Sequence, residues 1–186
     1  MRIVAGSLRG RSLATPAHDG VRPTSDRVRE SLFNILAHGV DGFTLAGARV
    51  ADLFAGTGAL GLEAISRGDA SCLFVEDNAE SRALIRRNVE SFGLTGVTRI
   101  FRRDATDLGP AGTMGRFDLA FLDPPYGKGL ADKALVSLVA GQWLAAGAVV
   151  VIEERAGTPV ALPAGLAAID SRTWGDTAVT IARLKA

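Results

Sequence analysis

Acidic and polar residues follow several short apolar runs of the chain, and their types suit ligand binding and amine chemistry. The run "ARVADLF" contains Asp52, and later apolar runs are followed by Glu76, by Asp104 and by "DPPY" at 123–126. If these runs are parallel strands, their carboxyl ends meet at one edge, which is where doubly wound sheets bind ligands. We therefore expect one site at that edge.

The stretch "VADLFAGTGALGLEA" (50–64) has the Gly56-x-Gly58-x-x-Gly61 spacing of a dinucleotide-binding loop, with an acid 20 residues beyond the first glycine. Asp52 opposes that reading, because a carboxylate about 4 Å from a pyrophosphate costs roughly 4 kcal/mol at an effective dielectric of about 20. S-adenosylmethionine is cationic and has no phosphate, so it suits Asp52. Gly56 and Gly58 let the backbone approach the ligand, and Gly61 allows tight helix–strand packing.

Three further acids follow the second and third runs. Glu76 suits ribose hydroxyls, a role that serves NAD and S-adenosylmethionine alike. Asp77 either assists it or caps the helix expected from residue 79. Asp104 either accepts a hydrogen bond from an adenine amino group, with Ala105 offering a backbone N–H, or caps the next turn.

The tetrad "DPPY" is the most specific signal. Pro124 and Pro125 fix φ and donate no hydrogen bond, which predicts a rigid loop with bare carbonyls. Asp123 and the Pro124 carbonyl then accept both hydrogens of a flat –NH2 group, which localises the nitrogen lone pair for in-line attack on a methyl group. Tyr126 stacks on the base that bears the amine, an interaction worth roughly 1–3 kcal/mol per base.

These residues need elements that place them at one edge, and the pattern supplies them. Hydrophobic periodicity predicts helices at 59–67, 79–94 and 129–144, and strands at 48–54, 71–76, 97–101, 117–123 and 147–154. Residues 165–184 predict two strands around a turn at 174–176. This alternation indicates an α/β fold whose parallel sheet is covered on both faces, with a hairpin at its edge.

The first 46 residues have a different pattern. "RIVAG" and "RGRSL" predict a small hairpin, and 22–36 predicts an amphipathic helix capped by Thr24 or Ser25. Residues 1–30 carry six arginines against three acids, a local excess typical of a phosphate-contacting arm and equally of ordinary surface arginines.

Composition excludes several classes of protein. The 186 residues are 47% hydrophobic and 22% charged, with a net charge of +1, which fits one globular domain. Cys72 is expected to be a small buried hydrophobe, and His18 and His38 surface residues, so we expect no disulfide and no metal site. The longest apolar run, 144–152, is too short to span a membrane. We expect a soluble, cytoplasmic protein.

In their order and spacing, "DLFAGTGALGLEA", "FVEDN", "RRDA" and "FDLAFLDPPY" resemble the class I S-adenosylmethionine-dependent amino-methyltransferases. "RIVAGSLRGRSL" and "RPTSDRVRESLFNIL" narrow the resemblance to the bacterial 16S ribosomal RNA guanine-N2 methyltransferases of the RsmD type. It implies a Rossmann-like, seven-stranded, mostly parallel sheet with an antiparallel last strand. It also implies an RNA-contacting extension at 1–46 packed on a methyltransferase domain at 47–186.

The resemblance implies methyl transfer from S-adenosylmethionine, leaving S-adenosylhomocysteine, to the N2 amine of a guanine in 16S rRNA. The expected substrate is a partly assembled small subunit, bound by a monomer. Phe54 and Ala55 join the expected cofactor contacts, because they belong to the glycine-loop motif. The expected RNA contacts are Arg9, Arg11, Arg22 and Thr24.

Other functions stay open at this point. The same chemistry on adenine N6 or on a protein glutamine amide uses the same "DPPY" loop, although no extra DNA-reading domain or large docking domain accompanies it. A non-catalytic RNA-binding module would not need the complete set of acids. A NAD reductase would need a second domain with a hydride-transfer acid, and Asp52 opposes it.

Overall fold

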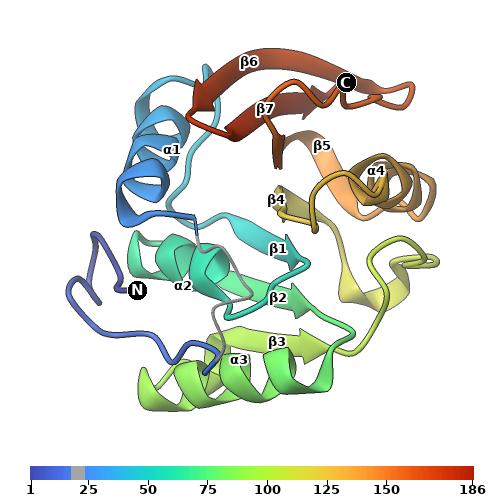
Figure 1. The fold of residues 1–186 in the computed structure, drawn as a ribbon. Helices are drawn as coiled ribbons and strands as arrows, with labels where there is room; N and C mark the ends of the chain where they lie inside the picture. The colour runs from blue at the N-terminus through green and yellow to red at the C-terminus, as the bar shows by residue number, and fades with distance from the viewer. Residues whose placement is uncertain (18–23) are drawn as a thin grey trace.

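The computed structural model describes residues 1–17 and 24–186, and its centre is one seven-stranded sheet (Figure 1). The strand order is β3-β2-β1-β4-β5-β7-β6. The strands are β1 (Arg49–Leu53), β2 (Ser71–Val75), β3 (Thr98–Phe101), β4 (Phe117–Leu122), β5 (Leu144–Arg155), β6 (Leu166–Trp174) and β7 (Thr177–Leu184). Neighbours pair in parallel from β3 to β5, and β7 is antiparallel to both of its neighbours. The expected fold class is confirmed.

In the described part of the chain, four α-helices cover the sheet. They are α1 (Asp26–His38), α2 (Ala59–Ser66), α3 (Ala79–Ser91) and α4 (Leu130–Ala140), and short 3-10 helices occupy Thr95–Val97 and Gly112–Met114. Buried side chains of α1, α2 and α3 pack on one face of the sheet, and those of α4 pack on the other. None of these described helices is long and apolar enough to cross a membrane.

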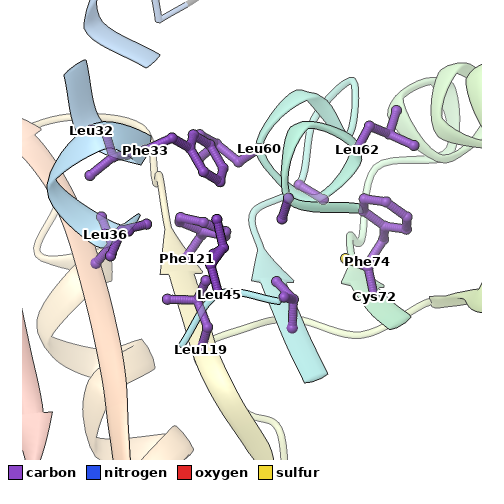
Figure 2. Packing of buried hydrophobic residues seen from close by; sticks show 14 of the residues in the cluster. Leu32, Phe33, Leu36, Leu45, Leu60, Leu62, Cys72, Phe74, Leu119 and Phe121 are labelled. Atoms are coloured by element: carbon purple, nitrogen blue, oxygen red, sulfur yellow. The ribbon is translucent and has the colours of Figure 1, made fainter. Parts of the chain in front are cut away.

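Alternating strand residues build the two cores. In β4, Leu119 and Phe121 face the helices α1 to α3, whereas Ala120 and Leu122 face α4. Figure 2 shows Phe33 of α1 beside Phe121, with ring centroids 5.6 Å apart. This alternation is the period-2 pattern of a strand buried on both faces.

Gly61 of α2 shows why this helix needs a glycine within its first turns. A Cβ atom there would lie 2.5 Å from the Cys72 sulfur and 2.6 Å from the Phe74 ring. The expectation of tight helix–strand packing is confirmed. Cys72 is buried, as expected, and His38 is exposed, whereas His18 lies outside the described residues.

The N-terminal residues pack on the same core. Arg2 and Ser12 form an antiparallel bridge, which is the expected hairpin reduced to one pair. Ile3 and Leu13 join the cluster that α1 shares with the sheet. Residues 1–46 therefore contribute to one core with the rest, and their division from 47–186 stays a proposal about organisation.

Some element ends differ from the prediction. Helix α1 begins at Asp26, because the Ser25 side chain caps it by accepting the Val28 N–H. Helix α3 ends at Ser91 rather than 94, because Gly93 takes the left-handed region at φ 69°. Helix α4 ends at Ala140 and β5 begins at Leu144, which leaves a turn in place of the predicted last helical residues.

Candidate active site

The register of the sheet brings the predicted strand-end residues together. Leu53 of β1 pairs with Val75 of β2 and with Leu122 of β4, and Leu122 pairs with Ile152 of β5. The next residues along these strands are Phe54, Glu76, Asp123 and Glu153. They lie at the point where strand order changes direction between β1 and β4, which is the ligand site of doubly wound sheets.

The loop after β1 has an unusual backbone. Phe54, Gly56 and Gly58 have φ of 57°, 59° and 80°, in the left-handed region that favours glycine. The Ala55 N–H donates to the Val75 carbonyl at 3.2 Å, and the Gly58 N–H donates to the Ala55 carbonyl at 2.8 Å. The loop is therefore folded tightly against the end of β2 before α2 begins.

Asp52 lies on β1 beneath this loop and is buried. Its Oδ2 accepts the Gly61 N–H at 3.0 Å, in the first turn of α2. Burial raises the pKa of Asp52 to about 8, the Gly61 N–H opposes that rise, and Glu76 adds to it. A nearby cation would lower this pKa, so the environment of Asp52 suits a positively charged ligand.

Glu76 joins the two loops at this edge. Its Oε2 accepts the Gly56 N–H at 2.9 Å, and its Oε1 accepts the Asn78 N–H at 3.0 Å. Each oxygen keeps a second lone pair, as a carboxylate needs for binding hydroxyl groups. Asn78, not Asp77, caps α3 by accepting the Ser81 N–H at 2.9 Å, and the Asp77 side chain is exposed.

Asp104 sits in a turn after β3. Its Oδ1 accepts the Thr106 N–H at 2.8 Å and the Thr106 hydroxyl at 2.7 Å. These bonds hold the pKa of Asp104 below its usual range. The turn-capping role is therefore present, Ala105 beside it is buried, and the adenine contact of both residues stays a prediction.

Asp123 follows β4 and is half-buried, with Pro124 buried and Pro125 exposed beyond it. No group of residues 1–17 or 24–186 donates a hydrogen bond to its carboxylate. Burial, and then the charges of Glu153, Asp52 and Glu154, raise the pKa of Asp123 well above its usual range. A ligand that brings hydrogen-bond donors or positive charge to this side chain would favour its ionised form.

The Tyr126 hydroxyl is held by residues from two other segments. Its hydroxyl donates to Glu153 Oε1 at 2.6 Å and lies 3.3 Å from the Thr177 hydroxyl. Burial and Glu153 raise the pKa of Tyr126, so the phenol stays protonated. Thr24 donates to the other Glu153 oxygen at 2.9 Å. The start of α1, the end of β5, β7 and the "DPPY" loop therefore meet at Glu153.

Sequence reasoning missed Glu153 and its neighbour Glu154. Both are buried near the end of β5. Glu154 Oε1 accepts the N–H of Gly127, the residue after Tyr126, at 3.2 Å. The signal was available, because two adjacent acids end the apolar run "AVVVIEE" at the same edge as the others.

The predicted RNA contacts do not all lie at this edge. Arg9 lies in the turn of the N-terminal hairpin, and its neighbour Leu8 donates to Ser66 at the far end of α2 from the glycine loop. Arg11 donates to the Ser91 carbonyl at 2.7 Å. Thr24 is at the candidate site, and Arg22 lies outside the described residues.

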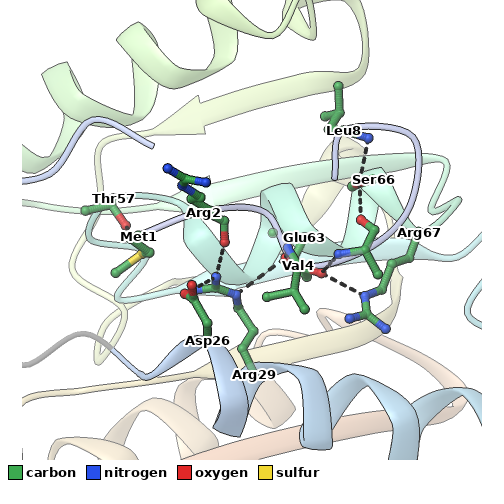
Figure 3. A network of polar contacts seen from close by, with 12 residues as sticks. Met1, Arg2, Val4, Leu8, Asp26, Arg29, Thr57, Glu63, Ser66 and Arg67 are labelled. Carbon is green, nitrogen blue, oxygen red and sulfur yellow. Dashed lines mark hydrogen bonds and ion pairs between the residues drawn. The ribbon is translucent and has the colours of Figure 1, made fainter. Parts of the chain in front are cut away.

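A buried polar network fixes the N-terminal residues on α2 (Figure 3). Glu63 accepts the N–H groups of Val4 and Ala5 at 2.9 and 3.0 Å and forms ion pairs with Arg29 and Arg67 at 3.4 and 2.9 Å. The Arg29 guanidinium also donates to the Arg2 carbonyl.

Among the described residues, no cluster of three histidine, cysteine or acidic side chains could hold a metal ion.

Comparison with known proteins agrees with this geometry. The model of a family described as Conserved hypothetical protein 95 matches residues 1–183. Ribosomal RNA small subunit methyltransferase D of Escherichia coli strain K12 is 40% identical over 157 residues, covering 83% of this chain and 75% of that protein. The Haemophilus influenzae protein of the same name is 31% identical over 177 residues, covering 94% and 89%. The solved structure of Escherichia coli yhhF superposes with a TM-score of 0.83 at 31% identity, covering 100% of this chain and 98% of that one.

Proposed function

Because the chain belongs to the Conserved hypothetical protein 95 family, we propose that it transfers a methyl group from S-adenosylmethionine to the exocyclic N2 amine of a guanine in 16S rRNA. The observation that carries the proposal is the meeting of Asp52, Glu76 and Asp123 at the switch between β1 and β4. That arrangement combines a cofactor edge with an amine-recognising loop.

The residues at this edge fit the cofactor. Asp52 and the neighbouring acids favour a cation, and Glu76 offers lone pairs to ribose hydroxyls. Gly56 and Gly58 have no side chain, so the ligand can approach the backbone of the loop closely. When bound, S-adenosylmethionine supplies an electrophilic methyl group on a sulfonium. Phe54, Ala55, Asp77, Asp104 and Ala105 complete the proposed contacts.

Asp123 and the Pro124 carbonyl would hold the amine by accepting its two hydrogens. The nitrogen forms a bond to the methyl carbon as the carbon–sulfur bond breaks, so positioning contributes most of the catalysis. The proton leaves as the nitrogen is alkylated and becomes acidic, and Asp123, as the ionised acceptor of an amine hydrogen, would take it. Tyr126, oriented by Glu153, would stack on the guanine, and Pro125 would keep the loop rigid.

The relatives' names support rRNA as the substrate, and we propose the remaining features with it. The substrate would be 16S rRNA in an assembling small subunit, met in the cytoplasm by a monomer that uses no metal. Arg9, Arg11, Arg22 and Thr24 would contact the RNA, with Thr24 nearest to the target base. Methylation of adenine N6 or of a protein glutamine amide is the second candidate, because the "DPPY" loop recognises an amine in each case.

One experiment separates these acceptors. The protein is given S-adenosylmethionine with a labelled methyl group and, separately, naked 16S rRNA, small subunits, DNA and a release factor, and each labelled product is digested to single units. We expect N2-methylguanine from the ribosomal material. Label in adenine or in glutamine would overturn the guanine assignment while keeping the chemistry.

A further inference from the structure

Charge is divided unevenly between one end of the sheet and the rest of the molecule. Residues 1–17 and 79–103 contain nine arginines and two acids, so they carry a charge of +7. The remaining residues contain 12 basic and 18 acidic side chains, so they carry −6. The net charge of +1 therefore results from two oppositely charged parts.

The positive residues lie on neighbouring elements. The N-terminal arm (residues 1–17) packs along α3, because Arg11 donates to the Ser91 carbonyl at 2.7 Å and lies 4.8 Å from the centre of the Phe92 ring. Ala14 and Asn88 of α3 also exchange backbone–side-chain hydrogen bonds, at 2.7 and 3.2 Å. Strand β3 follows α3 at the edge of the sheet.

The arginines of α3 continue the arm toward the candidate active site. Arg82 donates to two carbonyls of the loop after β2, at 3.2 and 2.6 Å, so it lies at the site edge. Arg86 lies one turn further along the helix. Arg87 is four residues before Ser91, the residue that Arg11 contacts. The 13 residues of α3 span about 20 Å, so the arginines extend over that length.

Several of these side chains are available to a partner. Arg9, Arg86 and Arg87 are exposed, and none forms an ion pair with an acid in the described ranges 1–17 and 24–186. All nine basic residues of this end are arginines, whose planar guanidinium matches phosphate oxygens through two hydrogen bonds. An RNA backbone, with a phosphate at every nucleotide, fits such an extended row.

We propose that the arginine surface, defined as Arg9, Arg11, Arg82, Arg86 and Arg87, binds the phosphate backbone of the RNA that flanks the target guanine. The inference rests on the proposed function for its choice of RNA as the partner. It adds α3 to the RNA-binding face, whereas the sequence alone had indicated only the N-terminal residues.

The test compares two triple variants that lose the same charge. One combines Arg9→Gln, Arg86→Gln and Arg87→Gln. The control combines Arg116→Gln, Lys133→Gln and Lys185→Gln, three exposed cations outside this surface. Arg86, Arg87 and Lys133 lie in helices, where glutamine keeps a helix propensity close to that of arginine and lysine. The other three residues are exposed and lie outside the helices, so both variants should fold. Binding of a full-length 16S rRNA transcript is measured between 50 and 200 mM salt, settings chosen to resolve the salt dependence of phosphate contacts.

We expect the first variant to bind the RNA at least about tenfold more weakly. The slope of the logarithm of the binding constant against the logarithm of the salt concentration should fall in magnitude by roughly 2–3, because each lost phosphate contact removes about 0.7–0.9. The control should stay within about twofold of the parent protein. Equal losses in both variants, or none in the first, would overturn the assignment. Polyglutamate competing as well as RNA would assign the surface to an acidic protein. Methyl transfer by the unchanged protein is measured separately, so a failure of the proposed function can be told apart from a failure of the arginine surface to bind RNA.

Discussion

Two regions of the molecule surround their carboxylates in opposite ways. Glu63, under the N-terminal arm, accepts two backbone N–H groups and pairs with two arginines. Asp123, at the strand ends, has acids as its charged neighbours, and no described group donates to it. A buried carboxylate that the fold has paired in this way cannot lose its charge without leaving its partners uncompensated, which destabilises the fold. Asp123, which no described group pairs and which lies beside the glycine loop, is a candidate place for a ligand to complete the pairing.

The largest expected effect comes from removing Asp123, the carboxylate that no described group pairs. Asp123→Ala should lower methyl transfer about 100- to 10,000-fold, since it removes both an amine acceptor and the proton acceptor. Binding of S-adenosylmethionine, measured by calorimetry, should stay within a few fold. The exposed Asp107 supplies the control, as Asp107→Ala should leave the labelled-methyl assay unchanged. Full activity of Asp123→Ala would end the proposed mechanism.

Removing the paired carboxylate should act on stability instead. Glu63→Gln removes the buried partner of Arg29 and leaves it paired only with the half-exposed Asp26, and breaking a buried pair costs about 3–5 kcal/mol of unfolding free energy. Denaturant unfolding measures the loss, with the exposed Glu90→Gln as the matched control. If Glu63→Gln were as stable as the control, the arm would not depend on this network.

Asp52 lies between the two cases, because it has one backbone donor and a raised pKa. Asp52→Asn keeps an acceptor for the Gly61 N–H and removes only the charge. We expect at least tenfold weaker binding of S-adenosylmethionine in calorimetry, about 1.4 kcal/mol, for both Asp52→Asn and Asp52→Ala. Parent-like affinity in the asparagine variant would make Asp52 a helix cap alone.

Asp69 shows that an unpaired carboxylate need not mark a site. It is buried just before β2, at the amino ends of the strands, opposite the candidate active site. Neither of its oxygens has a hydrogen-bond partner among the described residues. Burial and then Asp118 raise its pKa to about 8. Its position also differs, because Asp69 precedes a strand whereas Asp123 follows one at the carboxyl ends, beside the glycine loop.

The smallest predicted effect is the pH dependence that Asp69 confers. Between about pH 4 and pH 8 the folded protein keeps a proton on Asp69 that the unfolded chain has released, so stability falls as pH rises through that window. Asp69→Asn should remove this part of the fall in stability. The stability of the variant relative to the parent protein should therefore be higher at pH 8 than at pH 5. Parallel stability curves for the two proteins would show that Asp69 is ionised in the fold.

The sequence predicted the strand-end acids because each follows an apolar run, and parallel strands place such residues at one edge. It did not predict the Glu63 network, because a glutamate and two arginines on amphipathic helices look the same whether they face water or one another. Glu153 was missed for a related reason: it lies at the end of the fifth strand, and its partners Thr24 and Tyr126 are far away in the chain. Asp104 fits the turn-capping alternative, which the spacing alone could not separate from a ligand contact.

The hydrogen bond between Thr24 and Glu153 also bears on the order in which the protein is made. It joins residues 129 positions apart, whereas the arm reaches Glu63 over 58 or 59 positions and Asn88 over 74. As the chain leaves the ribosome, the arm can dock once α2 and α3 have emerged. Glu153 emerges much later, and closing the longer loop costs more entropy. The candidate active site should therefore be completed late in synthesis, after the surrounding scaffold has formed.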